Sequence, residues 1–127
     1  MIKKICVAGA GTMGSGIALA TAQNNFKTVL FDTNENGIEN AKKSISKNLE
    51  FLLTKEKITA AQQQTIYNRI LFTTNIKDCT GDLIIEAIVE NIEIKETLYK
   101  NLAAINTAQT IFGSNTSSLS KIGRAHV

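Results

Sequence analysis

The sequence contains no proline and no tryptophan, and it has one histidine and two cysteines among 127 residues. Without proline, one common marker of helix ends is missing, so the helix boundaries are predicted from periodicity and capping residues. No apolar run reaches the roughly 18 residues that a membrane span needs. Residues Met1 to Lys4 lead directly into an apolar strand, without the hydrophobic region of a signal peptide. We therefore expect a cytoplasmic protein with no membrane partner.

The two cysteines, Cys6 in an expected strand and Cys79 in an expected loop, show no spacing typical of a disulfide or a metal site. Unpaired thiols of this kind fit a reducing compartment. The net charge of +3 is small, and no basic stripe alternates with aromatic residues, so nothing indicates nucleic-acid binding. A group of lysines between two expected helices is typical of a solvated surface; its members are Lys42, Lys43, Lys47, Lys55 and Lys57.

Short apolar runs alternate with helical stretches, which predicts one α/β domain with a mainly parallel sheet. Strands are expected at residues 2–8, 27–32, 70–73, 83–86 and 110–113, and helices at 12–24, 35–53, 60–68 and 92–105. Thr59 is a plausible N-cap for the third helix, and Glu90 or Asn91 for the fourth. The second and third helices follow one another without a strand between them. They therefore form a helical hairpin inserted between the second and third strands.

A glycine-rich segment, Gly9-Ala-Gly11-Thr-Met-Gly14, directly follows the first expected strand and opens the first helix. Such a loop lets backbone N–H groups approach a pyrophosphate, and the helix N-terminus adds partial positive charge. Asp32, at the end of the second strand, is placed where a carboxylate accepts hydrogen bonds from an adenosine ribose. The alternative is a tight glycine turn without a ligand, but that alternative does not predict Asp32. The order of elements therefore predicts a Rossmann-type dinucleotide site.

Polar segments also follow the fourth and fifth strands, at residues 86–90 and 114–118. In open parallel sheets, ligands bind beyond the carboxyl ends of the strands, so four segments should converge at one edge. The residues themselves leave alternatives open. The segment Ser114-Asn-Thr-Ser-Ser118 can simply cap a helix, and the charges from Glu86 to Lys95 can simply interact with a helix dipole. If they are functional, they indicate that a second ligand binds beside the cofactor.

Three segments together resemble the N-terminal domain of 3-hydroxyacyl-CoA dehydrogenases, and most closely bacterial 3-hydroxybutyryl-CoA dehydrogenases. They are Val7-Ala-Gly-Ala-Gly-Thr-Met-Gly-Ser-Gly-Ile17, Glu86-Ala-Ile-Val-Glu-Asn-Ile-Glu-Ile-Lys95 and Ser114-Asn-Thr-Ser-Ser-Leu-Ser120. They occur in the family's order and spacing, and the resemblance covers about residues 1–122. The helical hairpin also looks like the family's insertion in this domain. The resemblance implies NAD as cofactor and a 3-hydroxyacyl-CoA as substrate.

The resemblance also implies roles for individual residues. The loop that holds the pyrophosphate would consist of Gly9, Gly11, Thr12, Met13 and Gly14. Asp32 would hold the adenosine ribose, and Glu90 and Lys95 would contact the nicotinamide half of the cofactor. Ser117 matches the serine that touches cofactor and substrate and positions the reacting oxygen. Lys55 matches a lysine near coenzyme A, and Asn48 stands where some members carry a serine for coenzyme A. No metal site is indicated.

The chain departs from the family pattern at its C-terminal end. In the family, the general base is a histidine of a His-Phe-Phe-Asn-type segment beyond the Asn-Thr-Ser-Ser-Leu stretch, followed by a helical domain that carries the dimer interface. The only histidine here is His126, and residues 123–127 do not resemble that segment. We therefore expect an NAD-binding domain at residues 1–122, a tail of uncertain origin at 123–127, and a parent enzyme that is a homodimer through a domain outside this chain.

These observations predict part of an oxidoreductase that transfers a hydride between a 3-hydroxyacyl-CoA and NAD, in fatty-acid or butanoate metabolism. Two alternatives stay open. One is a stand-alone NAD-sensing module without catalysis, which would not need the hydroxyl groups after the fifth strand. The other is a different dehydrogenase with the same glycine loop, which would not need the segment from Glu86 to Lys95. The residues do not define the acyl-chain length or the direction of the reaction.

Overall fold

The computed structural model describes residues 2–87, 92–107 and 109–114. Along the chain, the elements are β1 (Lys4–Ala8), α1 (Thr12–Gln23), β2 (Lys27–Phe31), α2 (Glu35–Thr54), α3 (Ala60–Asn68), β3 (Ile70–Thr73), the short 3-10 helix η1 (Ile76–Asp78), β4 (Leu83–Glu86), α4 (Ile92–Ile105) and β5 (Ile111–Ser114). The predicted strands and helices are all present, and their ends differ from the prediction by one or two residues. The helix η1 was not predicted.

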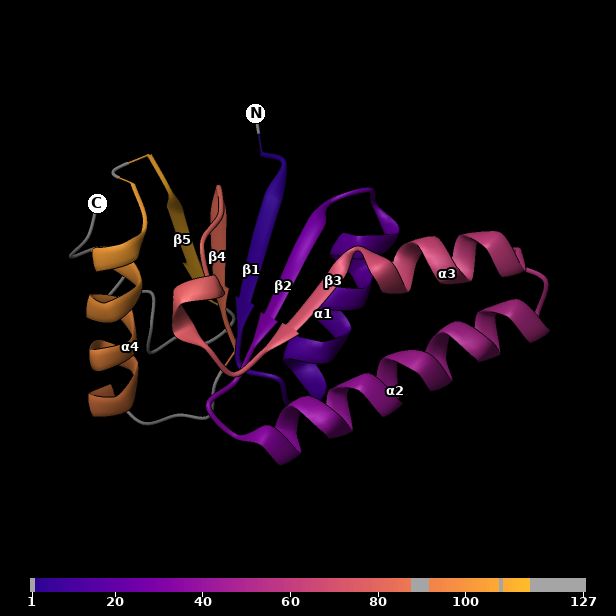
Figure 1. Cartoon of the computed structure of the whole chain (residues 1–127), viewed down its shortest axis with the longest axis horizontal. Coiled ribbons are helices and arrows are strands. Elements are labelled where there is room, and N and C mark those ends of the chain that lie inside the picture. Colours follow the sequence, from indigo (N-terminus) through magenta and orange to yellow (C-terminus); the bar gives the residue numbers. More distant parts are fainter. Residues whose placement is uncertain (1, 88–91, 108, 115–127) are drawn as a thin grey trace.

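The five strands form one sheet in the order β3-β2-β1-β4-β5, and each strand is parallel to its neighbours. The order reverses beside β1, because the chain first builds outward to β3 and then crosses back to β4 (Figure 1). Dinucleotides bind at such a reversal in doubly wound folds. The prediction of a Rossmann-type α/β fold with a mainly parallel sheet is therefore confirmed.

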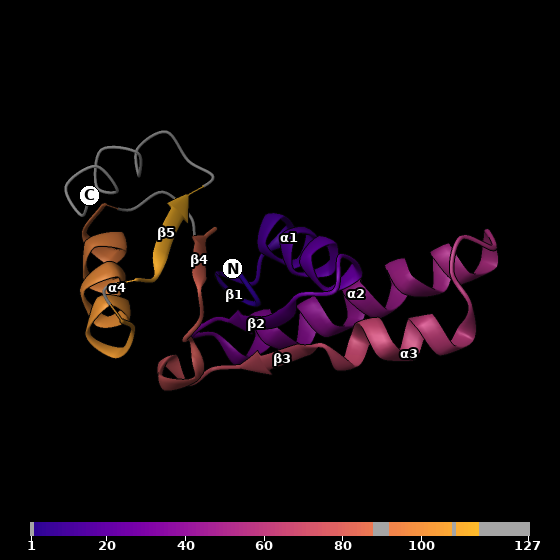
Figure 2. The ribbon, with the colours of Figure 1, turned by 90° about the horizontal axis from the view of Figure 1, so that it is seen from above.

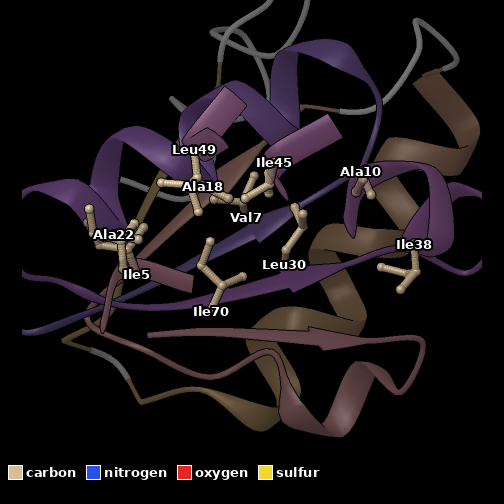
Figure 3. Packing of buried hydrophobic residues seen from close by; sticks show 12 residues of the cluster. Ile5, Val7, Ala10, Ala18, Ala22, Leu30, Ile38, Ile45, Leu49 and Ile70 are labelled. Carbon is tan, nitrogen blue, oxygen red and sulfur yellow. The ribbon is translucent and has the colours of Figure 1, made fainter. Parts of the chain in front are cut away.

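The sheet is covered on both faces. Along β1 and β2, alternate side chains point to opposite sides, so Val7 and Leu30 belong to one buried cluster while Cys6 and Val29 belong to the other. The first cluster packs α1, α2 and α3 against the sheet (Figure 3). The second cluster packs α4 and the η1 region against the opposite face, with Leu102 at its centre. Strands buried on both faces explain the continuous apolar runs in the sequence.

The α2–α3 hairpin projects beyond the β3 edge, at the opposite end of the sheet from α4 (Figures 1 and 2). The first helix of the hairpin, α2, packs against the rest of the domain through one buried face, formed by Ile38, Ala41, Ile45 and Leu49. Asn34 caps α2, and Thr59 forms a capping box with Gln62 at the start of α3, as predicted for Thr59. Although α2 has 20 residues, no helix within the described residues is long and apolar enough to cross a membrane.

Cys6 and Cys79 form a disulfide, with their Cα atoms 5.6 Å apart. The expectation of unpaired cysteines is therefore wrong. The physical reason is that 73 residues separate the two cysteines, and no local spacing records a contact of that range. The contact arises because β4 pairs directly with β1. The segment that leads into β4 therefore passes against the face of β1 that carries Cys6.

Candidate functional site

The carboxyl ends of four strands meet at one edge of the sheet. In the register of the sheet, Ala8 is paired with Phe31 and with Glu86, and Glu86 is paired with Ser114. The glycine loop follows Ala8 directly, and Asp32 follows Phe31 directly. Two of the four predicted polar segments therefore meet at this edge, and the other two begin there. Their remaining residues, 88–91 and 115–118, lie outside the described residues.

The glycine loop is a tight turn between β1 and α1. Gly9 has a φ of 115°, which side chains disfavour, and its N–H donates to the carbonyl oxygen of Phe31 at 2.7 Å. A Cβ at Gly14 would overlap the carbonyl oxygen of Gly9, so α1 can approach the loop this closely only with glycine at position 14. A Cβ at Gly11 would instead meet nothing within 4 Å. The loop therefore has open space at Gly11, where a ligand can reach the backbone.

The N-terminus of α1 is available for an anion. Gly11 is the N-cap of α1 and supplies no side-chain hydrogen bond, and no acidic residue lies in the first turn. The first N–H groups of a helix carry partial positive charge and have no partner inside the helix. Met13 in the same turn is 54% exposed. An anionic group beside Gly11 would therefore meet backbone donors and no competing carboxylate in this turn.

Asp32 is held in place by backbone N–H groups on both sides. Its Oδ2 accepts from the N–H of Ala10 and its Oδ1 from the N–H of Asn34, both at 2.9 Å. A Cβ on Gly37 would come within 3.4 Å of the carboxylate, so the first turn of α2 also packs close to it. A carboxylate has about four lone-pair positions, and two are used here. Asp32 therefore orders the loop and keeps acceptor capacity for a ligand.

A cavity of about 700 Å³ opens beside Asp32 at this edge of the sheet. Its walls come from the ends of β1, β2 and β3, from η1 and from α4. The lining combines apolar side chains with polar groups: Gly9, Phe31, Asp32, Thr33, Thr74, Asn75, Ile76, Thr97, Leu98 and Asn101. Apolar walls with a few placed polar groups are typical of sites for small organic ligands.

A second cavity, of about 380 Å³, lies on the other side of Asp32, between the glycine loop and α2. Gly11, Thr12 and Ser15 form one wall, and Asn40 and Ser44 are among the residues of the other. Asp32 borders both cavities. The carboxylate is thus the point where an extended ligand would pass from one cavity to the other.

The residues predicted to contact coenzyme A lie further along α2. Asn48 is exposed near the middle of the helix, and Lys55 is its C-cap. The Nζ of Lys55 lies 5.7 Å from the ring centroid of Phe51, whose side chain is 58% exposed. An exposed aromatic ring beside an ammonium group can bind an aromatic anion. The sequence analysis did not identify Phe51 as a partner of Lys55. The predicted residues at the glycine loop and on α2 thus occupy separate regions of the chain.

Three predicted residues cannot be placed by their side chains. Glu90 and Ser117 lie outside the described residues, as does the N-cap predicted at Glu90 or Asn91. Lys95 lies in the first turn of α4, and its side chain is not among those described. Their roles stay predictions.

The sequence analysis missed the walls of the larger cavity that come from the end of β3 and from α4. Thr74, Asn75 and Ile76 follow β3 as directly as Asp32 follows β2. The rule that ligands bind beyond the carboxyl ends of strands would have found them if it had been applied to the third strand. The α4 residues Thr97 and Leu98 could not be found by this rule, because they lie inside a helix and not at the end of a strand.

Glu86, at the end of β4, is fully buried and does not line the larger cavity. Burial first, and the negative charge of Glu86 second, raise the pKa of Tyr99 to about 12. Tyr99 therefore keeps its proton at neutral pH and donates to the carbonyl oxygen of Gly113 at 3.4 Å. This hydrogen bond links α4 to β5. Among the described residues, no group of histidine, cysteine, aspartate or glutamate side chains could hold a metal ion.

Comparison with known proteins identifies the family. Residues 4–123 match the family model described as "3-hydroxyacyl-CoA dehydrogenase, NAD binding domain". The chain is 44% identical over 117 residues to a probable 3-hydroxybutyryl-CoA dehydrogenase of Deinococcus radiodurans, and 40% identical over 119 residues to that of Bacillus subtilis. These alignments cover 91% and 93% of the chain, but 42% of each relative. The chain therefore spans less than half the length of these relatives.

Solved structures agree with the sequence match. The crystal structure of (S)-3-hydroxybutyryl-CoA dehydrogenase from Ralstonia eutropha superposes with a TM-score of 0.87 and 33% identity. The superposition covers 92% of this chain and 42% of the Ralstonia eutropha enzyme. The 3-hydroxybutyryl-CoA dehydrogenase of Escherichia coli gives the same TM-score with 32% identity, over 92% of this chain and 25% of that one. The fold of this chain is thus shared, over 92% of its length, with solved structures of these dehydrogenases.

Proposed function

Because the chain belongs to the 3-hydroxyacyl-CoA dehydrogenase family and contains its NAD-binding domain, we propose that it serves an enzyme that transfers a hydride between C3 of a 3-hydroxyacyl-CoA and NAD. The observation that carries the proposal is the position of Asp32 between two cavities, next to an uncapped helix N-terminus at Gly11. Bound NAD would supply the chemistry, since its nicotinamide ring accepts or returns the hydride.

Several features of the described residues support NAD binding. The open space at Gly11 and the N-terminus of α1 suit the pyrophosphate. Asp32 is already held by backbone donors and can accept from the ribose hydroxyls, so binding does not have to order it first. The larger cavity, with Phe31, Ile76 and Leu98 in its walls, offers apolar surface for the adenine ring. We propose that the pyrophosphate contacts involve Thr12 and Met13 as well.

The nicotinamide half of the cofactor would be held by Glu90 and Lys95, and Ser117 would position the oxygen on C3 of the substrate. These assignments follow from the matched motifs. The chemistry also needs a general acid or base to exchange the proton of that oxygen. A serine hydroxyl cannot do this at neutral pH, and the only histidine of the chain, His126, lies in the segment that departs from the family. We propose that the base belongs to a segment outside this chain.

Acyl-CoA recognition would fall to α2. Lys55 can pair with a phosphate of coenzyme A, and Asn48 can hydrogen-bond the same ligand. The contact between Lys55 and the exposed ring of Phe51 supports this position, because it holds an ammonium group beside a flat apolar surface. The nucleotide part of coenzyme A matches this pair of groups, because its aromatic ring can stack on Phe51 and its phosphates can pair with the ammonium group of Lys55.

The substrate assignment can be tested by calorimetric titration with coenzyme A. We expect Lys55→Ala to weaken binding about three- to tenfold, which corresponds to roughly 1 kcal/mol for an exposed charge pair. Lys57→Ala is the matched control, because Lys57 lies two residues away, is also exposed, and has no described contact with Phe51. Equal losses in the two variants would show that only net charge matters and would contradict a site at Lys55.

The larger assembly is part of the same proposal. We propose that residues 1–122 form the NAD-binding domain, that residues 123–127 are not part of it, and that the complete enzyme is a homodimer through a further helical domain. A role in fatty-acid or butanoate metabolism and a cytoplasmic location complete the proposal. The names of the relatives support the metabolic role, while the location rests on the sequence pattern alone.

A further inference from the structure

We infer that the Cys6–Cys79 disulfide is a redox-sensitive link to the cofactor site, such that its reduction weakens NAD binding and bound NAD protects it from reduction. The two sulfur atoms join the central strand β1 to the end of η1. The inference rests on the proposed position of NAD in the larger cavity, and it does not depend on the substrate proposed above.

The link reaches the cofactor cavity through η1. The N–H of Cys79 donates to the carbonyl oxygen of Ile76 at 2.9 Å, and Ile76 lines the larger cavity together with Thr74 and Asn75. A single backbone hydrogen bond therefore connects Cys79 of the disulfide with Ile76 of the cavity wall. At the other end, Cys6 lies three residues before Gly9, in the strand that opens the glycine loop. Both ends of the link thus belong to segments that shape the site.

Other contacts of η1 are hydrogen bonds and the packing of Ile76 against the second buried cluster. The helix η1 has three residues, begins at Asn75, whose side chain accepts from the N–H of Lys77, and is joined to β3 by the hydroxyl of Thr73, which donates to Asp78 at 2.7 Å. Beyond Cys79, the side chain of Asn106 donates to the carbonyl oxygen of Cys79 at 3.1 Å. To these non-covalent contacts, the disulfide adds a covalent bond to the central strand.

Reduction changes the packing as well as the covalent link. Both cysteines are fully buried, in a cluster with Ala8, Phe31 and Ile84. When the bond breaks, two bonded sulfur atoms become non-bonded neighbours, which need a larger separation in a close-packed core. The central strand is paired on both sides and cannot yield easily, so we expect η1 to shift. A shift of η1 moves the cavity wall that carries Asn75 and Ile76.

The reaction is ordinary thiol–disulfide exchange. A dithiol reductant attacks one sulfur, the Cys6–Cys79 bond breaks, and a second attack releases both cysteines as thiols, so that two electrons and two protons pass from the reductant to the protein. The reverse reaction needs a small disulfide such as oxidised glutathione, which takes up the same two electrons and two protons.

Because both sulfurs are buried, attack requires local opening of η1. A ligand that rests on the η1 wall opposes this opening, and linkage makes the two effects reciprocal.

The test uses the complete 127-residue chain in oxidised and dithiothreitol-reduced form, with the thiol state checked by alkylation and mass spectrometry. By calorimetry, we expect the reduced form to bind NAD about fivefold more weakly. We also expect saturating NAD to slow the reduction of the oxidised form several-fold. The midpoint of thermal unfolding should fall on the order of 10 °C on reduction, because the bond closes a long loop. Equal NAD affinity in the two forms, or a reduction rate that NAD does not change, would overturn the inference.

Two variants separate coupling from general loss of stability. Cys6→Ala with Cys79→Ala should bind NAD like the reduced chain under all redox conditions. Ile66→Ala removes a buried side chain from the opposite face of the sheet, away from the cavity, and should lower the unfolding midpoint without changing the NAD affinity. If the double variant does not fold, the effect of NAD on the reduction rate of the unmodified chain still decides the question. A chain that carries two free thiols after purification in air would also contradict the inference.

Discussion

Asp32 connects the glycine loop with the start of α2 and borders both cavities, so its carboxylate has a structural role beside the ligand contact proposed for it. The sequence predicted its contact with the ribose, but not its contacts with the N–H groups of Ala10 and Asn34. Those contacts depend on how the loop and the start of α2 come together, which residue spacing does not record. A substitution at Asp32 therefore has to be judged by affinity and stability separately.

We expect NAD to bind at least about tenfold better than NADP, because the extra 2′-phosphate would meet the negative charge of Asp32. Thr33 and Asn34, which follow Asp32, offer no arginine to compensate. Asp32→Ala should weaken NAD binding about tenfold or more, through loss of hydrogen bonds to a charged acceptor, and should shrink the preference for NAD. Calorimetric titration of both cofactors measures both effects.

Asp82→Ala is the matched control for Asp32→Ala. The Oδ2 of Asp82 also accepts from two backbone N–H groups, those of Lys3 and Lys4, but Asp82 precedes β4 and Lys4 starts β1, so this cluster lies at the opposite edge of the sheet. The control should lower stability and leave NAD affinity unchanged. A chain that binds the two cofactors equally well would contradict the role of Asp32.

Gly11→Ala separates ligand binding from folding even more directly. A Cβ at position 11 meets nothing within 4 Å, and the residue has a φ of −69°, which alanine accepts. We expect a loss of stability below about 1 kcal/mol, from the poorer N-cap, and a loss of NAD affinity of more than tenfold, because the methyl group would occupy space meant for the pyrophosphate.

Gly16→Ala provides the comparison for Gly11→Ala, since a Cβ at Gly16 also meets nothing within 4 Å. Gly16 lies inside α1, where alanine should stabilise the helix by about 0.5–1 kcal/mol and leave the affinity unchanged. If Gly11→Ala bound NAD as tightly as the unmodified chain, the pyrophosphate would not approach this part of the loop.

At the scale of elements, the sequence predicted each strand and α-helix of the described residues but missed η1 and the disulfide next to it. Periodicity detected helices as short as α3, with nine residues, and strands of four or more residues, whereas η1 has a single turn with no apolar pattern. The α2–α3 hairpin could be predicted because each of its helices has its own pattern and Thr59 marks a boundary. The sequence analysis named the glycine loop and Asp32, which border the cavities, but not Thr74 to Ile76, which line the larger one. The ligand contacts of these residues stay predictions.

The starts of β1 and β4 are joined by a charged group, which makes this connection depend on pH. The N–H groups of Lys3 and then of Lys4 donate to the carboxylate of Asp82 and lower its pKa below the ordinary value of 3.8. A folded-state pKa below that of the unfolded chain means that the folded state binds fewer protons. The contribution of Asp82 is therefore complete above about pH 4 and is lost as the pH falls through the folded-state pKa.

Denaturant unfolding of Asp82→Asn and the unmodified chain between pH 2 and pH 7 tests this dependence. We expect the unmodified chain to be the more stable one at neutral pH, and the difference to shrink as the pH falls below 4. Because Asp82 is exposed to solvent, the difference at neutral pH should also decrease at high salt. A difference that stays constant down to pH 2 would show that the hydrogen bonds do not depend on the charge of the carboxylate.

At the scale of the whole molecule, the chain matches the NAD-binding domain of its family, and we propose that it contacts the adenosine half and the pyrophosphate of NAD. The described part of the chain contains the larger cavity, Asp32 and the N-terminus of α1. Its relatives are more than twice as long. Under the proposal that the general base lies outside this chain, binding of the cofactor can be measured separately from catalysis.

We expect the 127-residue chain to bind NADH but to show little or no oxidation of NADH with acetoacetyl-CoA. The loss of a general acid or base commonly costs about 10²–10⁴ in rate, and incomplete positioning of the substrate adds several kcal/mol to the barrier. His126 is the only histidine of the chain, and nothing in the neighbouring sequence would orient it. The measurement is NADH absorbance at high protein concentration, for the unmodified chain, His126→Ala and Ser117→Ala. Turnover that persists in His126→Ala would reveal a base that neither the sequence nor the described site identifies, whereas turnover abolished by that change would make the final residues part of the active site.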